Sequence, residues 1–193
     1  AVKAYKKAIS LRPDSAEFHN NIGLAYVKLG ELDLAKKSFE SAISNNPKIA
    51  EIFNNYGNAL LENGEINAAR DSFLRAIQID SSFVDALWNL SGTVTTIDEH
   101  ISFLEDCLQI DQGYKKAKLM LSSMKAYLGD PGELNTVLET SLCNHPYIRS
   151  TCWLIDLKRR PAVYFNRCQF YDSVSKLSQP SRPFYEFGVW RGS

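Results

Sequence analysis

A stretch of 34 residues recurs along this chain, and this period constrains the fold more than any other feature of the sequence. When residues 16–49 are laid on residues 50–83, small and aromatic residues recur at matching places. The matched pairs are Gly23 and Gly57, Gly30 and Gly64, Ala35 and Ala69, Phe39 and Phe73, and Ala42 and Ala76. A period of this length indicates an array of similar units. One unit cannot bury its apolar face alone, so neighbouring units must stack.

The recurring glycines predict where helices touch and where they end. Gly23 and Gly57 fall inside helical patterns, where glycine costs about 1 kcal/mol relative to alanine, so we expect two helices to pack closely there. Gly30 and Gly64 suit the left-handed conformation that ends the first helix of a pair. Each unit is therefore predicted to be two helices joined by a turn. The predicted helices cover residues 16–29, 32–45, 50–63 and 66–79.

This pattern of small, aromatic and breaker residues resembles the tetratricopeptide (TPR) repeat. The resemblance implies an all-α fold, a right-handed TPR superhelix (an α–α solenoid) with C-terminal capping helices. The predicted organisation is a TPR array over residues 1–146, capping helices over 147–178, and a linker with the start of a truncated α/β domain over 179–193. Within the array, a partial repeat covers 1–15, and repeats follow at 16–49, 50–83, about 84–114 and about 115–148.

The later repeats depart from the first two. The third has lost three residues and its turn glycine, so we expect a shortened first helix and then a second helix from Asp98 to Ile110, capped by Asp98. In the fourth, Gly129 occupies the turn and Pro131 is placed to start the second helix. Beyond it we expect one more amphipathic helix from about residue 147, and another near 162–177.

Composition and charge argue against several classes of function. The net charge of zero argues against a general nucleic-acid binder. No apolar run approaches the roughly 20 residues that cross a bilayer, so we expect no membrane partner. The four cysteines show no C-x-x-C pairing and fit reduced thiols in a cytoplasmic protein. The three histidines lack metal-ligand spacing, so we predict no metal site. We also expect no catalytic residue within residues 1–193.

Asparagines recur in the predicted first helices and point to binding. Asn21, Asn55 and Asn89 stand 34 residues apart, and we name them the asparagine row; Asn20 and Asn54 lie beside two of them. The first helices of a TPR stack line its concave face, where an amide can bind a peptide backbone as donor and acceptor. The row resembles the asparagine ladder of the O-GlcNAc transferase superhelix. Alternatively, these amides bond only across adjacent helices.

Other residues of the first helices are predicted to line the same groove, with Trp88 as its apolar anchor. They are Glu17, Leu24, Lys28, Glu51, Asn58, Asp85 and Trp88.

A second motif lies at the end of the sequence. Residues 184–193 read as a short strand running into a glycine turn, with the wording E-F-G-V-W-R-G-S. This resembles the first motif of S-adenosylmethionine-dependent methyltransferases, in particular the macrocin O-methyltransferase (TylF-like) group. The resemblance implies that a longer parent protein binds S-adenosylmethionine through Glu186, Gly188 and Gly192. No cofactor is expected for residues 1–193 alone.

Three functions follow as hypotheses. The first is a scaffold that binds a protein or an extended peptide, forming the N-terminal recruiting region of a larger protein. The second is part of an S-adenosylmethionine-dependent methyltransferase whose catalytic domain lies beyond residue 193. The third is a structural array that forms homo-oligomers through its end helices.

Overall fold

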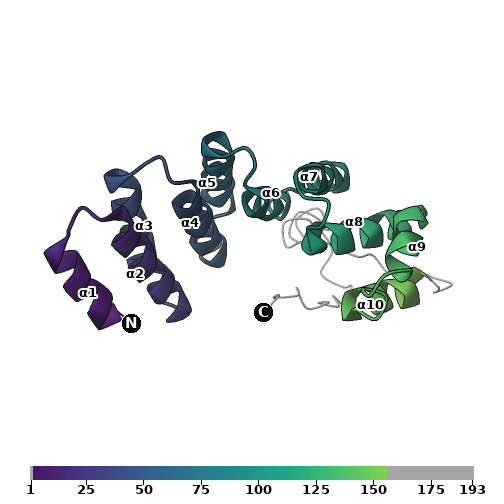
Figure 1. Ribbon diagram of the computed structural model, residues 1–193, viewed down its shortest axis with the longest axis horizontal. Coiled ribbons are helices and arrows are strands. Elements are labelled where there is room, and N and C mark those ends of the chain that lie inside the picture. The colour runs from purple at the N-terminus through teal and green to yellow at the C-terminus, as the bar shows by residue number, and fades with distance from the viewer. Residues whose placement is uncertain (1, 156–193) are drawn as a thin grey trace, which may run out of the picture. The chain divides into compact units, whose positions relative to one another are not determined.

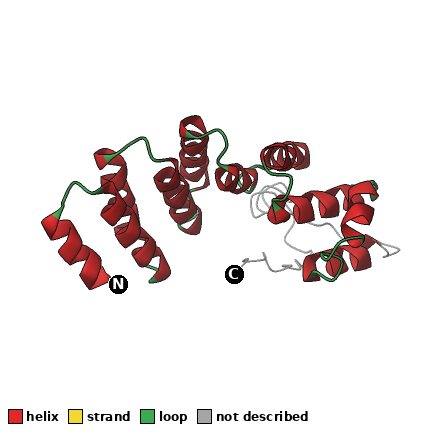
Figure 2. Ribbon diagram, viewed as in Figure 1, coloured by secondary structure: helices red, strands yellow, loops and turns green. Residues whose placement is uncertain are grey.

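In the computed structural model, helices joined by short loops make up the described residues (Figures 1 and 2). The structure describes residues 2–155, apart from the side chains of residues 147, 153 and 154. The helices in this range are α1 (Val2–Leu11), α2 (Ala16–Lys28), α3 (Leu32–Asn45), α4 (Ala50–Glu62), α5 (Ile66–Ile79), α6 (Val84–Ser91), α7 (Ile97–Ile110), α8 (Lys115–Leu128), α9 (Gly132–Leu138) and α10 (Pro146–Ile155). The chain divides between Leu90 and Ser91 into two compact units.

The first unit contains two helix pairs, α2 with α3 and α4 with α5, at the places that the 34-residue period predicts. Gly30 and Gly64 have φ of 76° and 80°, which confirms the predicted left-handed caps. After Gly30, the Glu31 amide donates to Tyr26 O at 3.0 Å, and the Gly30 amide donates to Val27 O at 3.0 Å. These two bonds satisfy carbonyls at the end of α2 and turn the chain into α3.

Each helix pair closes around a phenylalanine. Phe39 in α3 and Phe73 in α5 are fully buried, as are the alanines one turn to either side of them. A Cβ built on Gly23 would lie 2.8 Å from Phe39 Cε1, and one built on Gly57 would lie 2.5 Å from Phe73 Cε1. Such distances leave no room for a methyl group. The predicted close packing at both glycines is therefore confirmed.

Polar contacts join one pair to the next within the first unit. The Tyr56 hydroxyl on α4 donates to Glu40 Oε1 on α3 at 3.0 Å. Burial, followed by this hydrogen bond, raises the pKa of Tyr56 to about 12, so the hydroxyl keeps its proton at neutral pH. Lys36 Nζ on α3 pairs with Glu65 Oε1 just before α5. These contacts cross the boundary between repeats, whereas the glycine contacts lie within a pair.

The third repeat shows the predicted shortened first helix, because α6 has eight residues. The prediction that Asp98 caps the next helix is wrong. Helix α7 begins at Ile97, and its cap is Thr96, whose hydroxyl accepts the Glu99 amide hydrogen at 3.3 Å. Thr96 has the extended backbone of an N-cap residue, with φ of −94° and ψ of 146°. Asp98 instead lies in the first turn, where its negative charge interacts favourably with the helix dipole.

The second unit, described from residue 91 to residue 155, has a core formed by α8, α9 and α10. Leu119, Leu134, Val137 and Ile148 are buried together there. A buried hydrogen bond from Thr151 to the Ser123 hydroxyl, at 2.9 Å, joins α10 to α8. Gly129 has the left-handed φ of 105° that its turn position predicts. Pro131 caps α9, which has only seven residues.

Some predicted features lie outside the described residues. These are the helix near 162–177, the linker and α/β start over 179–193, and the cofactor motif at Glu186, Gly188 and Gly192. The predicted amphipathic helix from about residue 147 corresponds to α10. Among residues 2–155, none of the helices is both long and apolar enough to span a bilayer.

The glycine contact predicts an unusual response to alanine. Gly57→Ala improves helix propensity by about 1 kcal/mol, yet its methyl group overlaps the Phe73 ring, and the expected net result is a loss of roughly 1–3 kcal/mol of unfolding free energy. Urea unfolding measures this loss. In a Phe73→Leu background the ring is gone, so the same alanine should cost less. An alanine that raises stability in the parent protein contradicts the contact.

Buried His100 predicts a pH-dependent stability. Its side chain on α7 is 2% exposed, and burial lowers its pKa to about 4. The unfolded chain takes up a proton below pH of about 6.5, while the folded chain does not, so stability falls as pH falls from about 6.5 toward 4. The full loss is on the order of 3 kcal/mol.

Urea unfolding at about pH 7.5 and pH 5 tests this expectation. His100→Gln should remove most of the pH difference in unfolding free energy. His19→Gln, which changes a histidine of the first unit, should leave the difference in place. Equal pH differences in the parent and in His100→Gln would show that His100 is not the group responsible.

Candidate peptide-binding face on the first helices

The repeated asparagines join successive first helices. Asn55 Nδ2 on α4 donates to Asn20 Oδ1 on α2 at 3.1 Å. Asn89 Nδ2 on α6 donates to Asn54 Oδ1 on α4 at 2.8 Å. Both bonds link residues 35 positions apart, one more than the repeat period. The interpretation that these amides bond across adjacent helices therefore applies to two of the three members of the row.

Asn20 and Asn54 differ from the asparagine row in their burial. They are 6% and 7% exposed, and their carbonyl oxygens accept the bonds just described. Their Nδ2 groups have no partner among the described residues, yet no polar side-chain atom there is buried without a partner. The two nitrogens must therefore reach the surface. Each of these side chains holds the neighbouring helix through its oxygen, while its nitrogen keeps some contact with solvent.

The remaining predicted groove residues lie on α2, α4 and α6 with graded exposure. Glu17, Lys28, Glu51 and Asp85 are exposed. Asn21, Leu24, Asn55, Asn58, Trp88 and Asn89 are half-buried. The Asn21 and Asn58 side chains make no hydrogen bond within residues 2–155. Leu24 packs against the core of the first helix pair. The hydrogen bonds bring the asparagines together, and binding by these residues stays a prediction.

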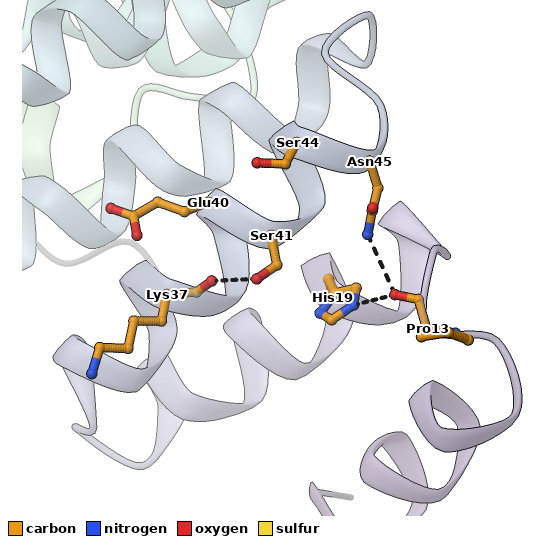
Figure 3. A pocket seen from close by; sticks show the side chains of 7 residues that line it. All are labelled: Pro13, His19, Lys37, Glu40, Ser41, Ser44 and Asn45. Atoms are coloured by element: carbon orange, nitrogen blue, oxygen red, sulfur yellow. Dashed lines mark hydrogen bonds between the residues drawn. The ribbon is translucent and has the colours of Figure 1, made fainter.

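A hollow of about 560 Å³ lies elsewhere in the first unit. Figure 3 shows its lining, which comes from the loop before α2, from α2 and from α3: Pro13, His19, Lys37, Glu40, Ser41, Ser44 and Asn45. No predicted groove residue lines it. His19 Nε2–H donates to Pro13 O at 2.8 Å, and Ser41 donates to Lys37 O at 2.9 Å. Asn45 Nδ2 donates to the same Pro13 O at 3.5 Å, so His19 and Asn45 hold the loop to the helices, whereas the Ser41 bond lies within α3.

Metal chemistry has no support in the described part of the chain, where no three His, Cys, Asp or Glu side chains are grouped to hold an ion. Cys107, Cys143 and Cys152 are free thiols, and Cys107 is buried.

Family models agree with the helix pairs and their caps. A TPR repeat model matches residues 1–30, and a tetratricopeptide repeat model matches residues 21–82. Residues 1–82, which these models match, therefore carry tetratricopeptide repeats. Among curated proteins, none matches it.

Solved TPR structures share this fold. MamA is 22% identical, with a TM-score of 0.61 over 79% of this chain and 85% of its own. YrrB, described as a TPR protein with an unusual peptide-binding site, is 19% identical, with a TM-score of 0.62 over 79% of this chain and 82% of its own. The first TPR of Spaghetti (RPAP3), bound to the HSP90 peptide SRMEEVD, is 17% identical, with a TM-score of 0.55 over 59% of this chain and 93% of its own. At these identities the likeness shows the fold, and the predicted all-α TPR solenoid class is confirmed.

Proposed function

We propose that this TPR protein is a binding scaffold that receives an extended peptide on the first-helix face of its first unit. We define this face as the exposed and half-buried side chains of α2, α4 and α6. Two of the similar structures, YrrB and the first TPR of Spaghetti, are described with a peptide-binding site or a bound peptide. The fold is therefore one on which peptides bind in other proteins.

The proposal rests on asparagine side-chain amide groups that the hydrogen bonds between helices do not use. Asn20 and Asn54 keep surface N–H donors although their side chains are more than nine-tenths buried. Asn21 and Asn58 keep both donor and acceptor. An extended peptide presents N–H and C=O groups that lack internal partners, and such amides can bond both. This chemistry recognises a backbone without requiring a particular side chain.

Rigidity also favours binding on this face. The helices that carry the amides are joined to one another through the Asn20–Asn55 and Asn54–Asn89 bonds, so less ordering is needed when a peptide arrives. Half-buried Leu24 and Trp88 provide apolar surface within the same set of helices. Trp88 is the residue that we propose as the anchor for an apolar peptide side chain.

Removal of the unpaired amides tests the proposal. Asn21→Ala combined with Asn58→Ala should lose binding of ligands selected from an extended-peptide library, while unfolding free energy changes by only about 0.5 kcal/mol. Neither side chain has a bond to lose, which is why stability should hold. Fluorescence anisotropy and urea unfolding measure the two quantities.

Two comparison variants sharpen the result. Asn67→Ala combined with Asn135→Ala removes exposed asparagines from α5 and α9 and should leave binding intact. Asn55→Ala removes a donor from Asn20 and should cost about 1 kcal/mol of stability. If the Asn21 and Asn58 double variant binds every selected peptide like the parent, the first-helix face is not the site.

A second candidate function concerns a longer parent protein and rests on the sequence motif within residues 184–193. We propose that Glu186, Gly188 and Gly192 begin a binding turn for S-adenosylmethionine, with the repeats recruiting the methyl acceptor. Glycines in such a turn let the backbone approach the cofactor. Calorimetric titration of S-adenosylmethionine into a protein extended through a complete α/β domain tests this. Absence of heat from that protein contradicts the methyltransferase candidate.

A further inference from the structure

Asn63 and Gly64 form the only Asn-Gly pair of the sequence, in the turn between α4 and α5. Both residues are exposed. In such a pair the backbone nitrogen of the second residue can attack the side-chain amide carbon of the asparagine. The attack is easiest at glycine, which has no Cβ to obstruct it. Every other asparagine in the sequence is followed by a residue with a side chain, so this reaction has its least obstructed site at Asn63.

The reaction, which is a deamidation, needs only the turn itself and water. The Gly64 nitrogen bonds to Asn63 Cγ, and the bond from Cγ to Nδ2 breaks. Nδ2 leaves as ammonia, with its own two hydrogens and the proton lost from the Gly64 nitrogen. Water then opens the cyclic imide at either of its carbonyl carbons. Opening at Cγ leaves an aspartate, whereas opening at the backbone carbonyl leaves an isoaspartate, whose main chain runs through Cγ.

Hydrogen bonds at the end of α4 hold the reaction back in the folded chain. Asn63 has a helical backbone, with φ of −82° and ψ of −2°. At this ψ the Gly64 nitrogen lies beside the backbone nitrogen of Asn63 and away from its Cβ, so ψ must rotate before the nitrogen can reach Cγ. The Gly64 amide donates to Leu61 O at 3.0 Å, and the Glu65 amide donates to Leu60 O at 2.9 Å. The rotation breaks both bonds, so the last turn of α4 must open first, as exposed helix ends do more readily than buried segments.

The Asn63 side chain also takes part in a contact between the two helix pairs. Its Nδ2 donates to Glu65 Oε1, and the same oxygen pairs with Lys36 on α3. Hydrogen bonds from Lys36 and then from Asn63 lower the pKa of Glu65, so this carboxylate is charged at neutral pH. Deamidation replaces the Asn63 donor by a second negative charge beside Glu65, and like charges repel. An isoaspartate also lengthens the main chain by a carbon atom, inside a turn whose hydrogen bonds fix its length.

We infer that Asn63 is a site of spontaneous deamidation, which the last turn of α4 restrains and whose products loosen the contact between the two helix pairs. The change accumulates with time, because the released ammonia leaves the turn. It alters a contact outside the first-helix face, so this inference does not depend on the proposed peptide binding.

Incubation of the full chain at mildly alkaline pH tests the site, because the attack requires the Gly64 nitrogen to lose its proton. Mass spectrometry of proteolytic peptides should show that Asn63 loses its amide, while exposed Asn67, which precedes Ala68, keeps its own. Unfolding the chain in guanidinium chloride should raise the rate at Asn63 several-fold, since the end of α4 no longer restrains the turn. Equal conversion of Asn63 and Asn67, or equal rates in the folded and unfolded chain, overturns the inference.

The first helix pair offers matched variants. Leu29 stands at the place of Asn63, precedes Gly30 and has nearly the same backbone, with φ of −91° and ψ of −4°. Leu29→Asn should therefore add a second site of deamidation, at residue 29. Asn63→Leu should keep the turn and remove the first site. If residue 29 of the Leu29→Asn variant keeps its amide while Asn63 loses its own, the turn and its glycine do not determine the site.

Amide hydrogen exchange measures the consequence for the fold. In the deamidated chain the amide hydrogens of Gly64 and Glu65 should exchange several-fold faster than in the parent, because the end of α4 opens more often. Asn63→Asp isolates the effect of the charge and should speed this exchange less than the isoaspartate form does. An incubated Asn63→Leu chain should show no change with time. Equal exchange at these amides in the deamidated and parent chains would show that the contact is not loosened.

Discussion

The contact between a glycine and a phenylalanine ring sets the spacing of each helix pair in the first unit, and the other features of that unit depend on it. With Gly23 against Phe39 and Gly57 against Phe73, the two helices of a pair approach until a methyl group would no longer fit. Because the helices are this close, the rings of Phe39 and Phe73 are fully buried. It also fixes the direction in which α2 and α4 present their remaining faces, and therefore where the asparagines lie.

The sequence predicted the helices of the first two pairs well because the 34-residue period repeats in register and a glycine marks the turn within each pair. Helices α3 and α5 have the predicted bounds, and Gly30 and Gly64 end the preceding helices as expected. The cap of α7 was harder to predict because Thr96 and Asp98 both have suitable side chains. Only the backbone conformation decides which of them reaches a free amide hydrogen, and the residue type does not encode it alone.

The candidate site was predictable in its members but not in its bonds. A period of 34 suggests that Asn21, Asn55 and Asn89 are equivalent, yet the hydrogen bonds run with an offset of 35. That offset depends on how far successive helices rotate and slide relative to one another, which is a property of packing. For the same reason, Asn20 and Asn54 look like groove residues in the sequence, whereas the structure buries their side chains and exposes only a donor group.

The offset gives the row of amide bonds a direction, because the donor and the acceptor always come from different helices in the same order. In each bond the N-terminal helix supplies the oxygen and the C-terminal helix supplies the nitrogen. Helix α4 has both parts, Asn54 and Asn55, so duplicated copies of residues 50–83 would be compatible with one another without further change. Helix α6 has the donor Asn89, but Trp88 stands where the acceptor would be. The Trp88 side chain has no oxygen that could accept such a bond, so the row of amide bonds ends at α6.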